Sequence, residues 1–489
     1  MSAAREPLRR VVVAGGGQVG VLCAIAIRRA LPACEVVVIG LAPEQSAFAD
    51  RSATALPFTN RLHDRLGIGE DRIIREAGGS HRLVERLIGW GGEGQYETLS
   101  YGGASNPAQT TRFAREWGGG KQTGTVSRSP GSLAEVLAEA GRFCVPPGDV
   151  STPLDEVDYA LRWNPGAYRN ILIAEARSIG VAHVHGDIAA IQPGDDGGIA
   201  VLSIAGQGEL AADLFVDCSG PGAALLSVLA GYETQDWTAY LPVRRMMIAP
   251  PGQPMLALED RTTLLAEGWL SEFAGRDGLQ VALAMPDGLT REAAIRTLQS
   301  EPAEEIAISP GCASRPWLGN VVAIGDAAAR FEPLGRCNLD LAHRQLDLLL
   351  ELLPGRDVEP RERAEYNRRA GLMADAMRDT LGMAYAAPGA RRVFGDTKRS
   401  DALATTLDQF TRRGRLPTRE EAPFLSREYV GLLTALGFAR GIPPQSRTAD
   451  PREGEQAQSM FAAKARAALE YAPPYAQWLQ AALSPAPRG

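Results

Sequence analysis

Residues 9–40, "RRVVVAGGGQVGVLCAIAIRRALPACEVVVIG", form a predicted strand, glycine-rich turn, helix and second strand. Glycines at 15, 17 and 20 give G-x-G-x-x-G directly after a β-branched strand and at the start of a helix, which is the context that a dinucleotide-binding loop requires. Glycine lets the backbone turn tightly and approach a pyrophosphate, whose charge is stabilised at the helix N-terminus. The stretch therefore predicts a Rossmann-type domain. Its predicted cofactor-binding residues are Gly15, Gly17, Gln18, Val19 and Gly20.

The second strand lacks the acidic residue that usually binds the ribose hydroxyls. It ends at Val38-Ile39-Gly40, and the nearest acidic residue is Glu44. The ribose contact is then expected from a backbone group or from Glu44 at a displaced position.

Two later segments favour a flavin over a nicotinamide. Residues 214–226, "LFVDCSGPGAALL", form a predicted strand that ends at Ser219-Gly220, and "WLGNVVAIGDAAA" at 317–329 supplies Gly325-Asp326. In flavin hydroxylase-like folds such a Gly-Asp pair places a carboxylate on the ribityl chain. In this order and spacing the pieces predict FAD, with further contacts from Gly325, Asp326 and Leu334.

Composition and charge exclude several other classes of function. The chain has 489 residues, 45% of them hydrophobic, and a net charge of −7, which argues against nucleic acid or an anionic membrane as a partner. No run reaches the roughly 18 apolar residues of a membrane span, and the N-terminus lacks the apolar core of a signal peptide. Six widely spaced cysteines without CxxC favour reduced thiols in a cytoplasm. His183 and His185 are interpreted as strand residues, so no metal site is predicted.

The predicted fold class is α/β, a flavoprotein of the monooxygenase/hydroxylase-like kind with a mixed sheet. We expect a discontinuous FAD-binding domain over 8–235 and 310–355, a sheet-rich insertion over 236–309, and a helical substrate region over 356–489. Within the first domain, the apolar spacing over 58–90 predicts helix, and the Gly/Ser/Thr-rich stretch 91–130 predicts a long loop.

The chain resembles the flavin-dependent tryptophan halogenases over most of residues 8–440. The likeness rests on the phosphate loop, the strand at 214–226 and a further set of segments: "LPFTNRLHDRLGI" at 56–68, "REAGGSHRLVERLIGW" at 75–90, "YRNILIAEARSIGV" at 168–181, "LPVRRMM" at 241–247, "AEGWLSEFA" at 266–274 and "WLGNVVAIGDAAARFEPL" at 317–334.

This resemblance implies a two-component enzyme. A separate flavin reductase supplies FADH2, O2 converts it to a flavin hydroperoxide, and halide attack gives hypohalous acid. The oxidant then crosses a tunnel to a catalytic lysine beside an aromatic substrate. A transient reductase, O2, a halide and a small organic substrate are therefore the implied partners, and a homodimer is left open.

The residues expected around the chemistry depart from the family pattern at three places. Arg82 stands where the family has its catalytic lysine, and a guanidinium stays protonated and delocalised where an amine can react. "WLSEFA" keeps Trp269 of the W-x-W-x-I-P motif and replaces the rest. After "EPL" the family has Glu-Ser, and this chain has Gly335-Arg336. Arg82, Arg336 and Trp269 are the predicted catalytic residues.

These changes favour oxygenation of an aromatic or small organic substrate over lysine-assisted chlorination. Arg82 and Arg336, together with Arg244 or Arg245, are candidates for orienting an anionic substrate. A halogenase in which Lys121 takes the lysine role is a second hypothesis, and a catalytically silent flavin-binding scaffold or sensor is a third. The sequence leaves the substrate, the halide, the reductase and the oligomeric state open.

Overall fold

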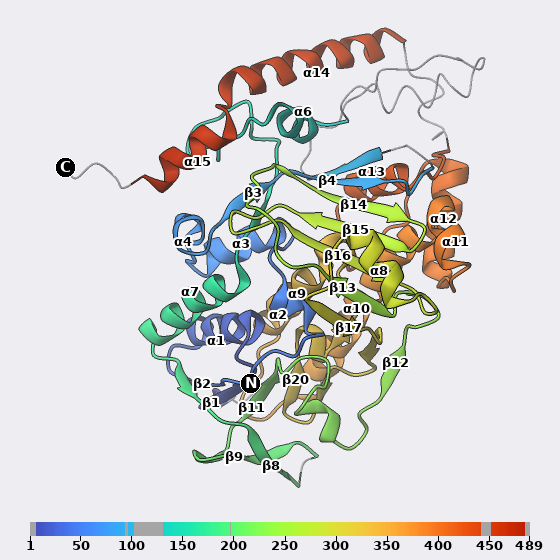
Figure 1. Ribbon diagram of the computed structural model, residues 1–489. Helices are drawn as coiled ribbons and strands as arrows, with labels where there is room; N and C mark the ends of the chain where they lie inside the picture. Colours follow the sequence, from blue (N-terminus) through green and yellow to red (C-terminus); the bar gives the residue numbers. More distant parts are fainter. Residues whose placement is uncertain (1–5, 93–95, 102–130, 196, 442–450, 485–489) are drawn as a thin grey trace, which may run out of the picture.

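The computed structural model describes residues 6–92, 96–101, 131–195, 197–441 and 451–484 (Figure 1). Its first layer is a six-stranded sheet in the order β19-β20-β11-β1-β2-β7. The strands are β1 (Arg10–Ala14), β2 (Glu35–Ile39), β7 (Ala182–Val184), β11 (Leu214–Asp217), β19 (Trp317–Leu318) and β20 (Val321–Ala323). All neighbours are parallel except β19 and β20.

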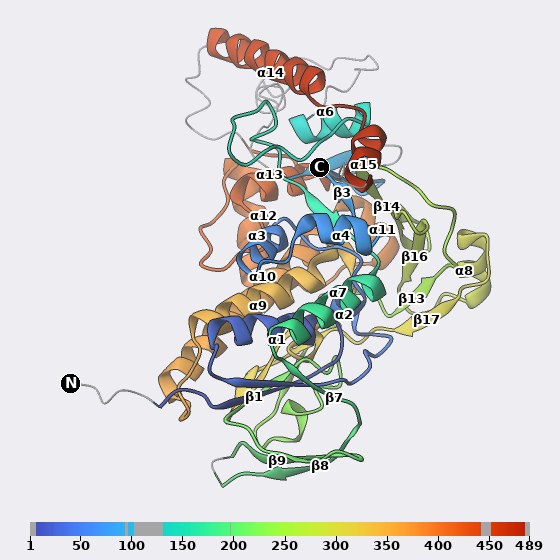
Figure 2. The ribbon, with the colours of Figure 1, turned by 90° about the vertical axis from the view of Figure 1, so that its left-hand side faces the viewer.

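Both faces of this sheet are buried, which explains the unbroken apolar run in β1. Val11 and Val13 point into the main core beneath the helices, while Val12 and Ala14 point to the opposite core. Figure 2 shows the helices on one side and the small sheet β10-β9-β8 on the other. These elements are α1 (Gln18–Ala30), α7 (Pro165–Ser178), α9 (Cys337–Glu351), β8 (Ile188–Pro193), β9 (Ile199–Ile204) and β10 (Gly208–Leu210). The strand–helix–strand prediction for 9–40 is confirmed.

The second layer is a seven-stranded sheet in the order β17-β13-β16-β15-β14-β4-β5. Its strands are β4 (Val84–Ile88), β5 (Tyr96–Ser100), β13 (Arg245–Ile248), β14 (Glu259–Leu265), β15 (Gly268–Phe273), β16 (Gln280–Met285) and β17 (Glu304–Ala307). Only the β14–β4 pair is parallel. The stretch 236–309, predicted to be rich in sheet, supplies β13 to β17, and two strands from 84–100 extend their sheet.

The helical prediction for 58–90 is wrong beyond residue 76. The segment forms α3 (Phe58–Arg65) and α4 (Glu70–Glu76), and then β3 (Ser80–Arg82) and β4. The strand β3 pairs with β6 (Ala160–Arg162), and β4 pairs with β14. Hydrogen bonding to strands more than 70 residues away thus overrides a local apolar spacing that suits either structure. The loop predicted over 91–130 contains β5, and its residues 102–130 lie outside the described part.

The remaining elements frame these two sheets. Short elements are α2 (Phe48–Arg51), α6 (Leu133–Ala140), α8 (Arg291–Leu298), β12 (Thr234–Asp236), β18 (Gly311–Ala313) and β21 (Ala329–Arg330). From residue 355 the described chain is helical, as predicted: α10 (Pro360–Tyr385), α11 (Pro388–Phe394), α12 (Asp401–Arg413), α13 (Ser426–Ala435), α14 (Pro451–Tyr471) and α15 (Tyr475–Leu483). In the described ranges, no helix is long and apolar enough to cross a membrane, and no His/Cys/Asp/Glu group is arranged to hold a metal ion.

Candidate functional site

The glycines of the phosphate loop are required by close backbone packing. Gly15 has φ +144°, and a Cβ on it would lie 2.3 Å from the carbonyl oxygen of Cys218 at the end of β11. A Cβ on Gly20 would lie 2.2 Å from the carbonyl oxygen of Gly15. The loop is thus held between β1, β11 and the first turn of α1, with its backbone open to close approach.

The N-terminus of α1 already binds an anion from the same chain. The Val19 N–H donates to Oδ1 of Asp50 at 2.8 Å, and a Cβ on Gly17 would lie 2.2 Å from that carboxylate oxygen. Burial raises the pKa of Asp50 to about 6, against the hydrogen bond from Val19. The Asp50 carboxyl group therefore occupies the helix N-terminus, the position at which a phosphate is stabilised in dinucleotide-binding folds.

Gln18 and Arg169 support this loop from two sides. The Gln18 side chain is buried; its amide donates to the carbonyl oxygens of Ala49 at 2.8 Å and Ser52 at 2.9 Å, so it ties α2 to α1. The Arg169 Nε donates to the carbonyl oxygen of Gly16 and places a cation beside the loop. Arg169 lies on α7, and no local pattern in the sequence distinguishes it from the chain's other arginines.

Asp326 lies directly beside α2. Its Oδ2 accepts a hydrogen bond from the Ala49 N–H at 2.7 Å, and its Oδ1 is buried with no hydrogen-bond partner among the described residues. Burial raises the pKa of Asp326 well above its usual range, and Asp50 and Glu44 add to that rise. Gly325 has φ +70° and donates its N–H to Oε1 of Gln345 at 2.8 Å, which fixes the turn. An unsatisfied buried acceptor is suited to a ligand hydroxyl.

No acidic residue ends β2, where a carboxylate usually binds the ribose hydroxyls of a dinucleotide. A Cβ on Gly40 would lie 3.3 Å from Nδ1 of His185, whereas Oε1 of Glu44 lies 3.1 Å from the corresponding position on Gly222. Glu44 therefore faces the turn after β11 and not the end of β2. The glycine cradle, which we define as Gly15, Gly17 and Gly20, fits the diphosphate of FAD together with the N-terminus of α1. Asp326 fits the ribityl part.

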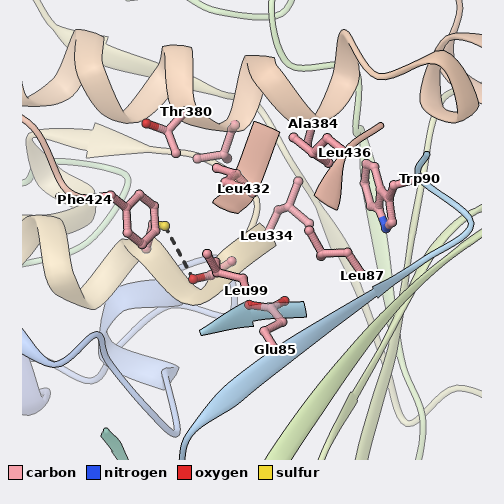
Figure 3. A pocket seen from close by; sticks show the side chains of 13 residues that line it. Glu85, Leu87, Trp90, Leu99, Leu334, Thr380, Ala384, Phe424, Leu432 and Leu436 are labelled. Atoms are coloured by element: carbon pink, nitrogen blue, oxygen red, sulfur yellow. Dashed lines mark hydrogen bonds between the residues drawn. The ribbon is translucent and has the colours of Figure 1, made fainter. Parts of the chain in front are cut away.

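An apolar pocket lies between the seven-stranded sheet and the C-terminal helices (Figure 3). Strands β4 and β5 form one wall, α10 and α13 form another, and the segment 334–337 closes one side. The lining residues are Glu85, Leu87, Trp90, Leu99, Leu334, Gly335, Cys337, Thr380, Leu381, Ala384, Phe424, Leu432 and Leu436. Leu334, predicted as a cofactor contact, is thus part of the pocket wall.

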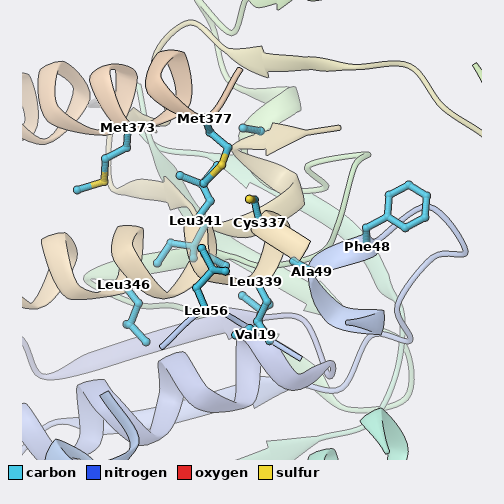
Figure 4. Close-up of a cluster of buried hydrophobic side chains, with 14 of the residues drawn as sticks. Val19, Phe48, Ala49, Leu56, Cys337, Leu339, Leu341, Leu346, Met373 and Met377 are labelled. Carbon is cyan, nitrogen blue, oxygen red and sulfur yellow. The ribbon is translucent and has the colours of Figure 1, made fainter. Parts of the chain in front are cut away.

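The segment 325–337 connects the two regions of the site. Asp326 stands at its start and Gly335 and Cys337 at its end, where α9 begins. Cys337 and Leu339 belong to the same buried cluster as Val19 and Ala49 (Figure 4). The first turn of α9 therefore packs between the phosphate loop and the apolar pocket.

Asp260 and Glu85 interact electrostatically with both Arg82 and Arg336. Arg82 is fully buried, with Nη1 3.4 Å from Oδ2 of Asp260 and 3.9 Å from Oε2 of Glu85. Burial lowers the pKa of Arg82, but Tyr101, Asp260 and Glu85 outweigh it, so its pKa is raised. The Arg336 guanidinium lies 4.7 Å from the ring centroid of Phe273, and burial lowers its pKa. The structure thus places both predicted arginines beside the pocket wall that carries Glu85.

Trp269 belongs to a separate chain of hydrogen bonds. It is buried in β15 and is not among the pocket-lining residues; its Nε1 donates to the Tyr385 hydroxyl at 3.1 Å. The Tyr385 hydroxyl donates in turn to Oε1 of Glu332 at 2.6 Å. Of the other candidates, Arg244 and Arg245 donate to carbonyl oxygens in nearby turns, and Lys121 lies outside the described residues.

Glu332→Gln should remove a pH dependence of stability. Burial raises the pKa of Glu332 to about 7 from 4.5, against the hydrogen bond from Tyr385. The folded state therefore keeps a proton that the unfolded state loses, and the parent loses stability as pH rises through about 4.5 to 7. The free energy of unfolding of the variant relative to the parent should be higher at about pH 8.5 than at about pH 5, by on the order of 2 kcal/mol.

Urea unfolding of both proteins at the two pH values measures this difference. The glutamine keeps an oxygen to accept the Tyr385 hydrogen bond, so packing is unchanged. Equal differences at the two pH values would show that Glu332 does not titrate in this range.

The sheet order, the glycine cradle and the anion-binding end of α1 define an α/β flavoprotein fold with a separate apolar pocket. The tryptophan halogenase family matches residues 10–451. The chain is 27% identical to the tryptophan 6-halogenase SttH of Streptomyces toxytricini over 64% of each chain, and 26% identical to the tryptophan 7-halogenase KtzQ of Kutzneria sp. (strain 744) over 76% of this chain and 75% of that one.

The structure is also similar to solved flavin-dependent halogenases. BrvH of Brevundimonas sp. BAL3 superposes with a TM-score of 0.86 at 22% identity, covering 98% of this chain and 99% of that one. Xcc4156 of Xanthomonas campestris gives 0.86 at 21% identity over 99% and 100%. The chain belongs to the tryptophan halogenase family.

Proposed function

We propose that this protein is an FAD-dependent oxidoreductase that uses reduced FAD and O2 to oxidise a small aromatic substrate bound in the apolar pocket. The observation that carries the proposal is the pocket at Gly335 and Cys337, joined to the Asp326 region by the first turn of α9. The reduced cofactor comes from a separate flavin reductase, as family membership implies.

One region of the site holds the cofactor, and the other holds the substrate. The loop at Gly15, Gly17 and Gly20 and the N-terminus of α1 would hold the diphosphate, and Oδ1 of Asp326 would accept a hydrogen bond from a ribityl hydroxyl. Bound reduced FAD supplies the activation of O2. Trp90, Phe424 and the leucines of the pocket exclude water from the substrate ring.

Arg82 directs the oxidant towards the substrate and does not carry it covalently. Its Nε is buried without a hydrogen-bond partner among the described residues, while Nη1 is ion-paired with Asp260 at 3.4 Å, so Nε is the donor that can orient an electronegative atom. A guanidinium lacks the free amine that the lysine of the family provides. With Gly335 in place of the family glutamate, lysine-assisted chlorination is not the route that we propose; oxygen transfer is.

Product mass tests this proposal. The protein is incubated with a flavin reductase, FAD, O2 and a panel of indoles and phenols, with and without bromide, beside reactions that lack the protein. We expect an oxygenated product whose yield does not depend on bromide. Arg82→Lys, which restores an amine, should raise bromination relative to the parent.

Two results would count against parts of this proposal. A brominated product from the parent would show halogenation with Arg82 in the position of the lysine. No product, with bound reduced flavin reoxidising as fast as free flavin, would contradict an oxidoreductase and favour a silent flavin-binding protein.

A further inference from the structure

Glu85 is a carboxylate inside an otherwise apolar pocket. It lies on β4, opposite Leu99 on β5, and shares its face of the sheet with Leu87. Its exposed fraction is 3%, and its carboxylate points towards the middle of the pocket in Figure 3. The side chain of Arg86, the next residue along the strand, pairs instead with Glu259 outside the pocket.

One of the two carboxylate oxygens of Glu85 lacks a hydrogen bond. Oε1 accepts from the Thr262 hydroxyl at 2.7 Å, which fixes the orientation of the group. Oε2 is buried with no hydrogen-bond partner among the described residues, and Arg82 Nη1 lies 3.9 Å away, beyond hydrogen-bonding distance. Leaving such an acceptor unsatisfied is costly, so a donor on a ligand would be bound strongly.

The rest of the pocket offers a ligand little polar recognition. The Thr380 hydroxyl is already engaged with the Ala376 carbonyl oxygen at 2.7 Å and the Tyr429 hydroxyl at 2.9 Å. The lining set of described residues contains no lysine, arginine or histidine, and the neighbouring Arg82 is already paired with Asp260 at 3.4 Å. A free amino acid would bury its carboxylate there without a partner.

We propose that Glu85 selects the substrate by accepting a hydrogen bond at Oε2 from a ring N–H or O–H of an uncharged aromatic molecule. The substrate class is then simple indoles or phenols, not an aromatic amino acid. This inference rests on the proposed function, because it takes the pocket to be the place where the substrate binds.

Binding to the flavin-free full-length protein tests the inference separately from catalysis. Calorimetric titrations compare indole with N-methylindole, which keeps the ring and removes the donor, and with free tryptophan. We expect indole to bind about ten- to a hundredfold more tightly than N-methylindole, as for a hydrogen bond to a charged acceptor, and tryptophan to bind more weakly than indole.

Glu85→Gln should abolish the preference for indole. The amide oxygen can still accept the Thr262 hydrogen bond, and the amide then turns a donor towards the pocket. The matched control is Glu272→Gln, a carboxylate on β15 of the same sheet that does not line the pocket, and it should keep the preference. Thermal unfolding of both variants checks that they fold.

Several outcomes would overturn the inference. They are no measurable binding of indole, equal affinity of the parent for indole and N-methylindole, tighter binding of tryptophan, or an unchanged preference in Glu85→Gln. Failure of the proposed function looks different, because turnover would then be absent while the indole preference and its loss in Glu85→Gln remain.

Discussion

Arg162→Leu is expected to destabilise the protein by about 3–5 kcal/mol, the cost of breaking a buried ion pair by removing one partner. Arg162 is 2% exposed and donates to Oδ1 of Asp260 through Nε at 3.1 Å and Nη2 at 2.8 Å. It also donates to the carbonyl oxygens of His81, Ala257 and Glu259 at 2.9, 2.6 and 2.8 Å. Leucine would fill much of the volume and leave all four acceptors without this donor. The free energy of unfolding in urea measures the loss.

Arg261→Leu is the matched control for this variant. Arg261 follows Asp260 on β14 and pairs with Glu259 at 2.9 Å, but its side chain is 47% exposed. Exposed pairs contribute about 0–1 kcal/mol, so this variant should unfold close to the parent. Comparable losses of unfolding free energy in the two variants would show that the buried Arg162–Asp260 pair stabilises the fold no more than an exposed pair does.

Gly15→Ala is expected to reduce FAD affinity by about a hundredfold or more, the equivalent of two lost charge-assisted hydrogen bonds to phosphate. The new methyl group would lie 2.3 Å from the carbonyl oxygen of Cys218, at a backbone φ of +144° that alanine disfavours. The loop must move off β11, and its backbone N–H groups then lose their alignment with the end of α1. Titration of FAD fluorescence measures the affinity.

Gly78→Ala separates this effect from general backbone strain. Gly78 also has a positive φ, +65°, but nothing lies within 4 Å of its Cβ position, and it is outside the phosphate loop. We expect it to lower thermal stability modestly and to leave FAD affinity unchanged. If both variants bound FAD like the parent, the loop at Gly15 would not be the diphosphate site.

The candidate site was only partly predictable from the sequence. The close packing of the loop at Gly15 and Gly20 was predictable, because its sequence pattern is contained in one strand, one turn and one helix. The pairing of Arg82 with Asp260 was not, because strands β3 and β14 are far apart in the chain and meet only in the folded sheet. Glu85 gave no signal either, since a carboxylate on an amphipathic segment usually faces solvent.

The sequence by itself determined the strand–turn–helix–strand unit over 9–40, the helical C-terminal region and the family resemblance, because strand, turn and helix preferences over 9–40 are local and mutually consistent. Only the tertiary structure decided that residues 84–100 are strands and that Asp50 occupies the end of α1. It also decided that Glu85 faces an apolar pocket. These features depend on hydrogen bonds and burial supplied by distant segments, which no local pattern records.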